Sequence, residues 1–190
     1  MQINQQTKRV GIVLCGGKST RMGRDKALMQ YHGKPHFLHV ADLLAEFCGK
    51  VVISGSPALY ANPQYPVFAD LPNIPCQGPA AGFYSIASQH QYADFLLMAC
   101  DYPLVGHEEI KPLIEQNAPI VAYRNNQGIT EALIAYYSAK AAEAVCKRIA
   151  AGECSLRHII DSMTTQYLTD ANDSLRSFDT IEDTKNFPII

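Results

Sequence analysis

Short apolar runs alternate with polar segments along most of the chain. Each run is continuous, which is typical of parallel strands that are buried on both faces of a sheet. Loop-forming residues bound the runs, as expected for separate strands. The predicted strands are residues 10–14, 51–54, 66–69, 95–99 and 119–123, with a later strand at 132–137.

Segments with helical spacing lie between these runs. From Phe37 to Cys48, apolar side chains recur every three or four residues and form one stripe. Strands that alternate with helices predict an α/β fold, here a three-layer α/β/α sandwich with a mostly parallel central sheet. Further helices are predicted at residues 80–90, 107–116 and 139–150, and Ser155 is a candidate N-cap for a last helix that reaches residue 162.

Composition narrows the class of protein. The chain has 190 residues, of which 47% are hydrophobic, enough to bury one core. We therefore expect a single domain over residues 1–190, with 1–8 as a loose N-terminal extension. The 16 basic and 18 acidic residues give a formal net charge of -2. Because nucleic-acid binding usually needs a basic excess, a small-molecule substrate is favoured and no nucleic-acid partner is expected.

The cysteines and the N-terminus indicate a compartment. Six cysteines are scattered without a C-x-x-C pair, and several fall inside apolar runs, which favours reduced, mostly buried thiols. The N-terminal MQINQQTKRV has no apolar stretch typical of a signal peptide. No segment approaches the roughly 18 apolar residues of a membrane span. We expect a cytoplasmic protein with no membrane partner.

The first predicted strand leads directly into LCGGKSTRMGRDK, residues 14–26. Its two glycines, Gly16 and Gly17, allow backbone amides to approach an anion closely, and four basic side chains follow within nine residues. The alternative is a basic surface turn, but the preceding strand favours a phosphate-binding loop. The P-loop pattern fails because Ile12 stands where that pattern needs glycine, and G-x-G-x-x-G is absent.

A carboxylate follows another buried strand. In FLLMACDYP, residues 95–103, Asp101 comes at the carboxyl end of the apolar run. Catalytic groups in parallel sheets lie at such ends, and Mg²⁺ typically uses one or two carboxylates together with substrate phosphates. The alternative is that Asp101 caps the helix near His107, but it lies too early in the chain for a direct cap. Asp101 is therefore the candidate metal ligand.

Two weaker features lie between these motifs. Gly78 precedes Pro79 in GPAAG at a predicted helix start, where backbone amides can face a ligand. Gly-Pro also opens many ordinary helices, so this pattern alone is not specific. Asp70, which ends its own apolar run, is likewise only suggestive.

The order of these motifs resembles that of the molybdenum cofactor guanylyltransferases. The resemblance rests on LCGGKSTRMGRDKALMQYHGKP, then Asp70, GPAAG, ACDYP and GECSLRHII, and it spans nearly the whole chain. It implies a nucleotide-diphospho-sugar transferase (Rossmann-like) fold that binds GTP and Mg²⁺, transfers GMP to the phosphate of molybdopterin and releases pyrophosphate. The resemblance assigns Lys26 and Arg21 to the phosphates and Asp101 to Mg²⁺, and places Leu14, Cys15, Gly16, Gly17, Ser54, Asp70 and Gly78 at the nucleotide.

Three departures from the family pattern leave the acceptor open. Ser54 and Glu131 stand where the family usually has asparagine and proline, and residues 177–180 read Ser-Phe-Asp-Thr instead of N-x-N-T. An aspartate such as Asp179 only accepts hydrogen bonds and repels a nearby phosphate. The alternatives are a CTP-dependent or sugar-phosphate nucleotidyltransferase and a catalytically silent nucleotide-binding regulator. The expected state is a monomer or small homo-oligomer.

Overall fold

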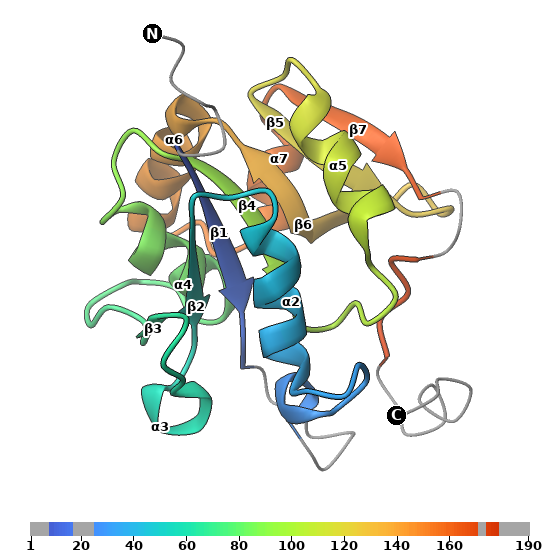
Figure 1. Cartoon of the computed structure of the whole chain (residues 1–190). Helices are drawn as coiled ribbons and strands as arrows, with labels where there is room; N and C mark the ends of the chain where they lie inside the picture. Colours follow the sequence, from blue (N-terminus) through green and yellow to red (C-terminus); the bar gives the residue numbers. More distant parts are fainter. Residues whose placement is uncertain (1–7, 17–24, 171–173, 179–190) are drawn as a thin grey trace, which may run out of the picture.

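A seven-stranded sheet runs through the part of the chain that the computed structural model describes, residues 8–16, 25–170 and 174–178 (Figure 1). The strand order is β3-β2-β1-β4-β6-β5-β7. β6 is antiparallel to β4 and β5, and the other neighbouring strands are parallel. The strands are β1 (Arg9–Leu14), β2 (Lys50–Ser54), β3 (Val67–Phe68), β4 (Asp94–Ala99), β5 (Ile120–Arg124), β6 (Thr130–Tyr137) and β7 (Thr165–Thr169).

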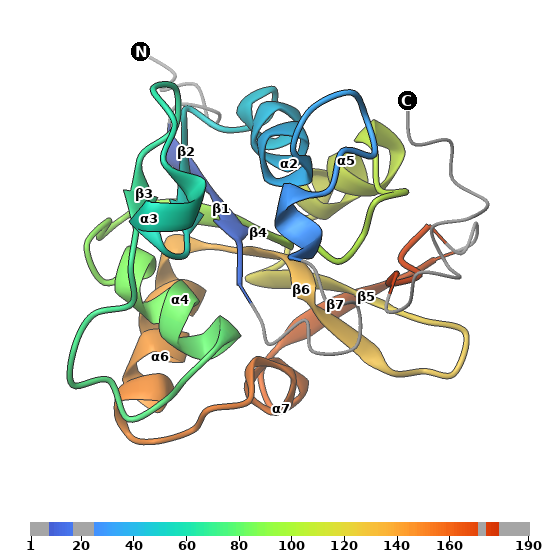
Figure 2. The same cartoon turned by 90° about the horizontal axis from the view of Figure 1, so that it is seen from below.

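Helices cover both faces of this sheet (Figure 2). α2 (His36–Ala45) and α5 (His107–Glu115) lie on one face. α4 (Pro79–Ala87), α6 (Ala139–Ala150) and α7 (Leu156–Asp161) lie on the other face. The predicted three-layer α/β/α sandwich with a mostly parallel sheet is therefore confirmed. None of the helices in the described residues has the length and apolar character needed to cross a bilayer.

The central strands form where the sequence has continuous apolar runs, because these strands are buried. All six residues of β1 are buried, and Ile12 and Val13 are fully inaccessible to solvent. β1 lies between β2 and β4 and is covered by helices on both sides, so its sequence needs no alternation of polar and apolar positions. Ser138 and Ser155 accept hydrogen bonds from the amides of Ala141 and His158, which caps α6 and α7.

Some boundaries and elements differ from the prediction. α4 ends at Ala87 rather than residue 90, and α7 ends at Asp161. Three short elements were not predicted: the 3-10 helix η1 (Lys26–Leu28), the helix α3 (Pro57–Tyr60) and the edge strand β7. β7 is half-exposed and contains polar residues, because it has only one neighbouring strand, so it lacks the apolar run that marks the central strands.

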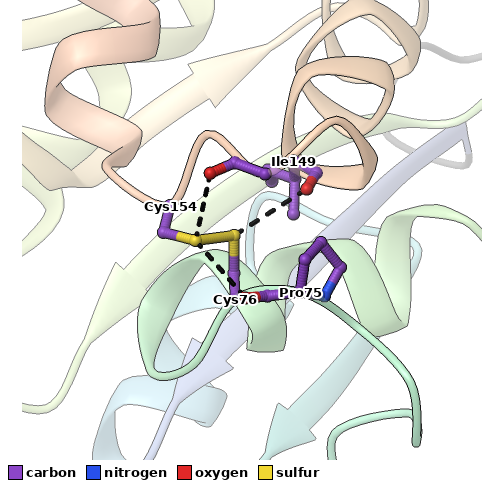
Figure 3. The surroundings of a disulfide bond; sticks show 5 residues. Pro75, Cys76, Ile149 and Cys154 are labelled. Atoms are coloured by element: carbon purple, nitrogen blue, oxygen red, sulfur yellow. Dashed lines mark hydrogen bonds between the residues drawn. A yellow bond between two sulfur atoms is a disulfide. The ribbon is translucent and has the colours of Figure 1, made fainter.

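The prediction that all cysteines are reduced is wrong. Cys76, in the loop before α4, forms a disulfide with Cys154, in the loop before α7, whereas Cys15, Cys48, Cys100 and Cys146 are free (Figure 3). The two cysteines are 78 residues apart and meet because α4 packs against α6, a contact that residue spacing does not reveal. The disulfide also removes the argument for a cytoplasmic location that rested on the cysteines.

Loss of this disulfide should reduce stability measurably. A crosslink that closes a long loop limits the conformations of the unfolded chain, so we expect reduction to lower the free energy of unfolding by about 2–4 kcal/mol. Urea denaturation with and without dithiothreitol measures the change. The double variant Cys76→Ser and Cys154→Ser is the control and should not respond to the reductant. An equal response in both proteins would show that the effect lies elsewhere.

Candidate active site

The strand order changes direction between β1 and β4. From β1 the chain moves through β2 to β3 on one side, and β4 begins the other half of the sheet. Ligands of open α/β sheets bind outside the carboxyl ends of the strands at such a point. Leu14 and Ala99 are paired in register, so the chain leaves both strands side by side. Figure 2 views the molecule from this edge of the sheet.

A pocket of about 720 Å³ lies over the carboxyl ends of β1, β2 and β3. Backbone hydrogen bonds continue past the strand ends, from Cys15 N to Ser54 O at 2.8 Å and from Gly55 N to Phe68 O at 2.9 Å. The loops that line the pocket are therefore held together where they begin. The lining residues are Leu14, Cys15, Gly16, Ser54, Gly55, Ser56, Pro57, Ala69, Asp70, Gln77, Gly78 and Pro79.

The start of α4 forms one wall of this pocket. Gly78 has a φ of 65°, a left-handed conformation that favours glycine, and Pro79 occupies the first turn of the helix. The opposite loop is tied to this helix, because Ser85 Oγ accepts a hydrogen bond from Leu71 N at 2.8 Å. That bond positions the neighbouring Asp70 at the exposed rim of the pocket.

Lys26 and Asp101 form an ion pair beside the carboxyl end of β4. Lys26 Nζ lies 3.4 Å from Asp101 Oδ1. The Lys26 side chain is 12% exposed and the Asp101 side chain 42% exposed, so the carboxylate can be reached from solvent. Lys26 begins the short 3-10 helix η1 (Lys26–Leu28), and Asp101 follows β4. The pair therefore joins two segments that are 75 positions apart in the sequence.

A second pocket, of about 570 Å³, lies over the other half of the sheet edge. Because β6 runs antiparallel, its first residues meet the carboxyl ends of β4, β5 and β7 at this edge. Phe178 N also donates to the carbonyl of Asp101 at 3.3 Å, which brings the C-terminal segment to the pocket. The lining residues are Asp101, Tyr102, Asn125, Asn126, Gln127, Glu131, Asp170, Leu175, Arg176 and Ser177.

A hydrogen-bond network organises the second pocket around Glu131. Its carboxylate accepts from Tyr102 Oη and from Asn125 Nδ2, both at 3.1 Å. Asn125 Oδ1 accepts from the amides of Gln127 and Ile129, each at 3.0 Å, and so fixes the loop between β5 and β6. Burial, reinforced by the charge of Glu131, raises the pKa of Tyr102, so its hydroxyl remains a donor.

Two thiols lie beneath the junction of the pockets. Cys15 Sγ and Cys100 Sγ are 3.5 Å apart, and both are buried. The hydrogen bond with Cys15, followed by burial, raises the pKa of the Cys100 thiol well above its ordinary value. A protonated buried thiol is a poor nucleophile. These cysteines therefore act as packing groups, and the chemistry of the site belongs to charged and backbone groups.

The structure groups the residues that the sequence predicts. Lys26 and Asp101 form the pair between the pockets. Gly17, Arg21 and Asp179 lie outside the described residues. The predicted nucleotide residues that line the first pocket are Leu14, Cys15, Gly16, Ser54, Asp70 and Gly78. Sequence reasoning missed Asn125 and Tyr102 in the second pocket, and it noted Glu131 only as a departure from a family pattern.

A family model described as the MobA-like NTP transferase domain matches residues 11–167. A curated relative, the molybdenum cofactor biosynthesis bifunctional protein of Synechocystis sp., is 34% identical over 144 residues, which are 70% of this chain and 40% of the relative. The chain therefore spans about two fifths of the length of that relative.

Two solved structures share the fold. Molybdopterin-guanine dinucleotide biosynthesis protein A from Archaeoglobus fulgidus superposes with a TM-score of 0.74 at 20% identity, covering 93% of this chain and 95% of its own. The bifunctional IspDF from Campylobacter jejuni gives a TM-score of 0.71 at 16% identity, covering 94% of this chain and 54% of its own. At these identities the likeness concerns the fold.

Proposed function

This chain belongs to the MobA-like NTP transferase family, and from that premise we propose that it transfers GMP from GTP to molybdopterin in a magnesium-dependent reaction. The proposal is carried by one observation, the pair Lys26–Asp101 at the boundary between two pockets on one sheet edge. Transfer between two substrates needs two adjacent sites with charge control where they meet. The resemblance of the motif order and the 34% identity to a molybdenum cofactor biosynthesis protein support guanylyl transfer.

The first pocket is the proposed nucleotide site. Its glycine-containing loop and the N-terminal end of α4 present backbone groups, which suits phosphates and a base. We assign Leu14, Cys15, Gly16, Ser54, Asp70 and Gly78 to the nucleotide. Gly17 and Arg21, in the adjoining segment, belong to the same proposed site through the resemblance.

Asp101 fits a magnesium ion in its chemistry and its exposure. Its carboxylate is a hard oxygen donor that solvent reaches, and the described residues around it hold no cluster of three or more metal-binding side chains. Mg²⁺ suits such a site, because it usually takes one or two carboxylates and completes its shell with water and substrate phosphates. Bound there, the ion would supply charge neutralisation on phosphate oxygens.

The proposed reaction forms a bond from the acceptor phosphate to the α-phosphorus of GTP and breaks the bond to the β-phosphate, so pyrophosphate leaves. Negative charge builds on the phosphate oxygens in this step. Lys26, which is paired with Asp101, is placed to donate to these oxygens. No covalent nucleophile is required, which agrees with the raised pKa of the Cys100 thiol.

The second pocket is the proposed acceptor site. Asp101 lines this pocket, and it follows Ala99, which is paired with Leu14 of the first pocket, so substrates in the two pockets would meet near this carboxylate. Arg176 supplies a positive charge at its lining, which suits a phosphorylated acceptor. The carboxylate of Glu131, which Asn125 and Tyr102 hold in place, supplies acceptors of hydrogen bonds that suit the amine and amide groups of a pterin.

A CTP-dependent reaction is the competing proposal, and the choice of nucleotide is testable directly. We expect GTP with Mg²⁺ to raise the melting temperature more than CTP, ATP or UTP does. At 100 times its dissociation constant a ligand adds about 2.7 kcal/mol, which is roughly 5–10 °C for a chain of this size. Differential scanning fluorimetry at matched concentrations measures the shift.

The same series in EDTA is the control, and the GTP shift should shrink there. A larger shift with CTP than with GTP would replace the guanylyl proposal by cytidylyl transfer. Stabilisation by GTP that is equal with and without Mg²⁺, combined with no release of pyrophosphate, would favour a silent nucleotide-binding regulator.

A further inference from the structure

Lys26 belongs to the 3-10 helix η1, which is too short to be stabilised by its own hydrogen bonds alone. η1 contains three residues, and such short 3-10 helices have poor hydrogen-bond geometry. Its backbone makes two hydrogen bonds, from Leu28 N to Asp25 O at 3.1 Å and from Met29 N to Lys26 O at 3.2 Å. The direction of the Lys26 side chain therefore depends on what fixes this turn to the rest of the molecule.

Asp25 provides part of that attachment. Its Oδ1 accepts from Ala27 N at 3.0 Å and caps η1, while its Oδ2 accepts from Tyr60 Oη at 2.5 Å. The same carboxylate thus holds the turn with one oxygen and is held by a tyrosine with the other. A hydrogen bond to an ionised carboxylate is stronger than one between neutral groups.

Tyr60 is itself held by close packing. It is 2% exposed, and its ring centroid lies 5.4 Å from that of Phe37. A Cβ atom added to Gly55 would lie 2.7 Å from the Tyr60 ring, so the ring packs directly on the backbone of the first pocket. Burial, followed by the hydrogen bond to Asp25, raises the pKa of Tyr60, so the hydroxyl stays protonated and remains the donor.

We infer that Tyr60 is a positioning residue, which fixes the Lys26 ammonium at the junction of the two pockets through its hydrogen bond to Asp25. The inference deepens the proposed function, because it rests on Lys26 acting at the phosphates. Tyr60 lines neither of the two pockets. It links the wall of the first pocket at Gly55 to the turn that carries Lys26.

The inference is tested first on the protein without nucleotide. Lys26 is 12% exposed, so its amine reacts slowly with acetic anhydride as long as η1 stays in place. Tyr60→Phe removes one hydroxyl and should raise the labelling rate of Lys26 about fivefold, the effect of losing a hydrogen bond of average strength. Peptide mass spectrometry gives the rate for each lysine, with the exposed Lys147 as internal reference.

Tyr65→Phe is the matched control. Tyr65 is also buried and its hydroxyl donates to a carboxylate, Asp42, at 2.6 Å, but among the described residues no hydrogen bond joins either residue to η1, and neither lines the first or the second pocket. This variant should leave Lys26 labelling unchanged. Equal labelling of Lys26 in wild type and Tyr60→Phe, or an equal rise in both tyrosine variants, would overturn the inference.

A double-mutant comparison separates positioning from packing. Asp25→Ala should raise Lys26 labelling at least as much as Tyr60→Phe, and the double variant should label no faster than Asp25→Ala alone, because Tyr60 acts through Asp25. If instead the increase in Lys26 labelling in the double variant equalled the product of the two single increases, the Tyr60 hydroxyl would act by a route other than Asp25.

Nucleotide binding gives the second measurement. In calorimetry Tyr60→Phe should weaken GTP–Mg²⁺ binding about fivefold in the wild-type background and have no effect in Lys26→Met. An effect of the same size in both backgrounds would contradict the inference. If wild type binds no nucleoside triphosphate, the proposed function fails, while the labelling experiment still decides the role of Tyr60.

Discussion

Replacement of Asp101 with asparagine should reduce nucleotidyl transfer by about 10²-fold or more, the usual cost of removing one group that stabilises charge in the transition state. Asparagine keeps the size of the side chain and one oxygen but loses the negative charge that attracts a divalent cation. The carboxylate is 42% exposed, so the fold should not depend on its charge. Pyrophosphate release in a coupled assay, with Mg²⁺ varied, measures the change.

Asp94→Asn is the control for this experiment. Asp94 begins the same strand at the opposite edge of the sheet, and its Oδ1 accepts from Ala139 N at 2.8 Å, a bond that asparagine can keep. This variant should transfer nucleotide at the wild-type rate. Near-normal turnover of Asp101→Asn at all Mg²⁺ concentrations would show that the metal is held elsewhere.

The sequence predicts the central part of the fold because burial leaves a local pattern. β1, β2 and β4 are buried over nearly their whole length, and each appears as a continuous apolar run. Their carboxyl ends then follow from the rule that parallel strands deliver their loops to one edge. Leu14, Ser54 and Asp101 could therefore be expected near one another before any coordinates were known.

The second pocket could not be predicted in the same way. It exists because β6 inserts antiparallel between β4 and β5, which places Glu131 beside Tyr102 and Asn125. No local pattern specifies which strand pairs with which, because the pairing is settled by contacts distant in sequence. The disulfide between Cys76 and Cys154 was missed for the same reason.

Short elements are a third reason why the prediction from sequence differs from the structure. α3 has four residues and β7 lies at an edge, so neither shows enough turns or alternations for a period to be recognised. Tyr60, at the end of α3, consequently carries no sequence pattern that marks it out. Its bond to Asp25 becomes visible only when α3 and η1 are seen together.

Replacement of Lys26 with methionine should lower the affinity for GTP–Mg²⁺ and raise the affinity for Mn²⁺ in the protein without nucleotide. Loss of a charged donor to the phosphates should weaken GTP–Mg²⁺ binding by about 10- to 100-fold, since hydrogen bonds to charged groups contribute about 1.5–3 kcal/mol. Because Lys26 Nζ lies 3.4 Å from Asp101 Oδ1, its removal also frees this carboxylate from a competing cation. The affinity of the nucleotide-free protein for Mn²⁺ should then rise by roughly two- to fivefold, the range for an exposed ion pair. Calorimetry gives the nucleotide affinity, and electron paramagnetic resonance of free Mn²⁺ gives the metal affinity.

Lys50→Met, at the opposite edge of the sheet, is the control and should change neither affinity. A fall in both affinities would mean that Lys26 supports the metal site structurally, and unchanged GTP binding would remove Lys26 from the phosphates.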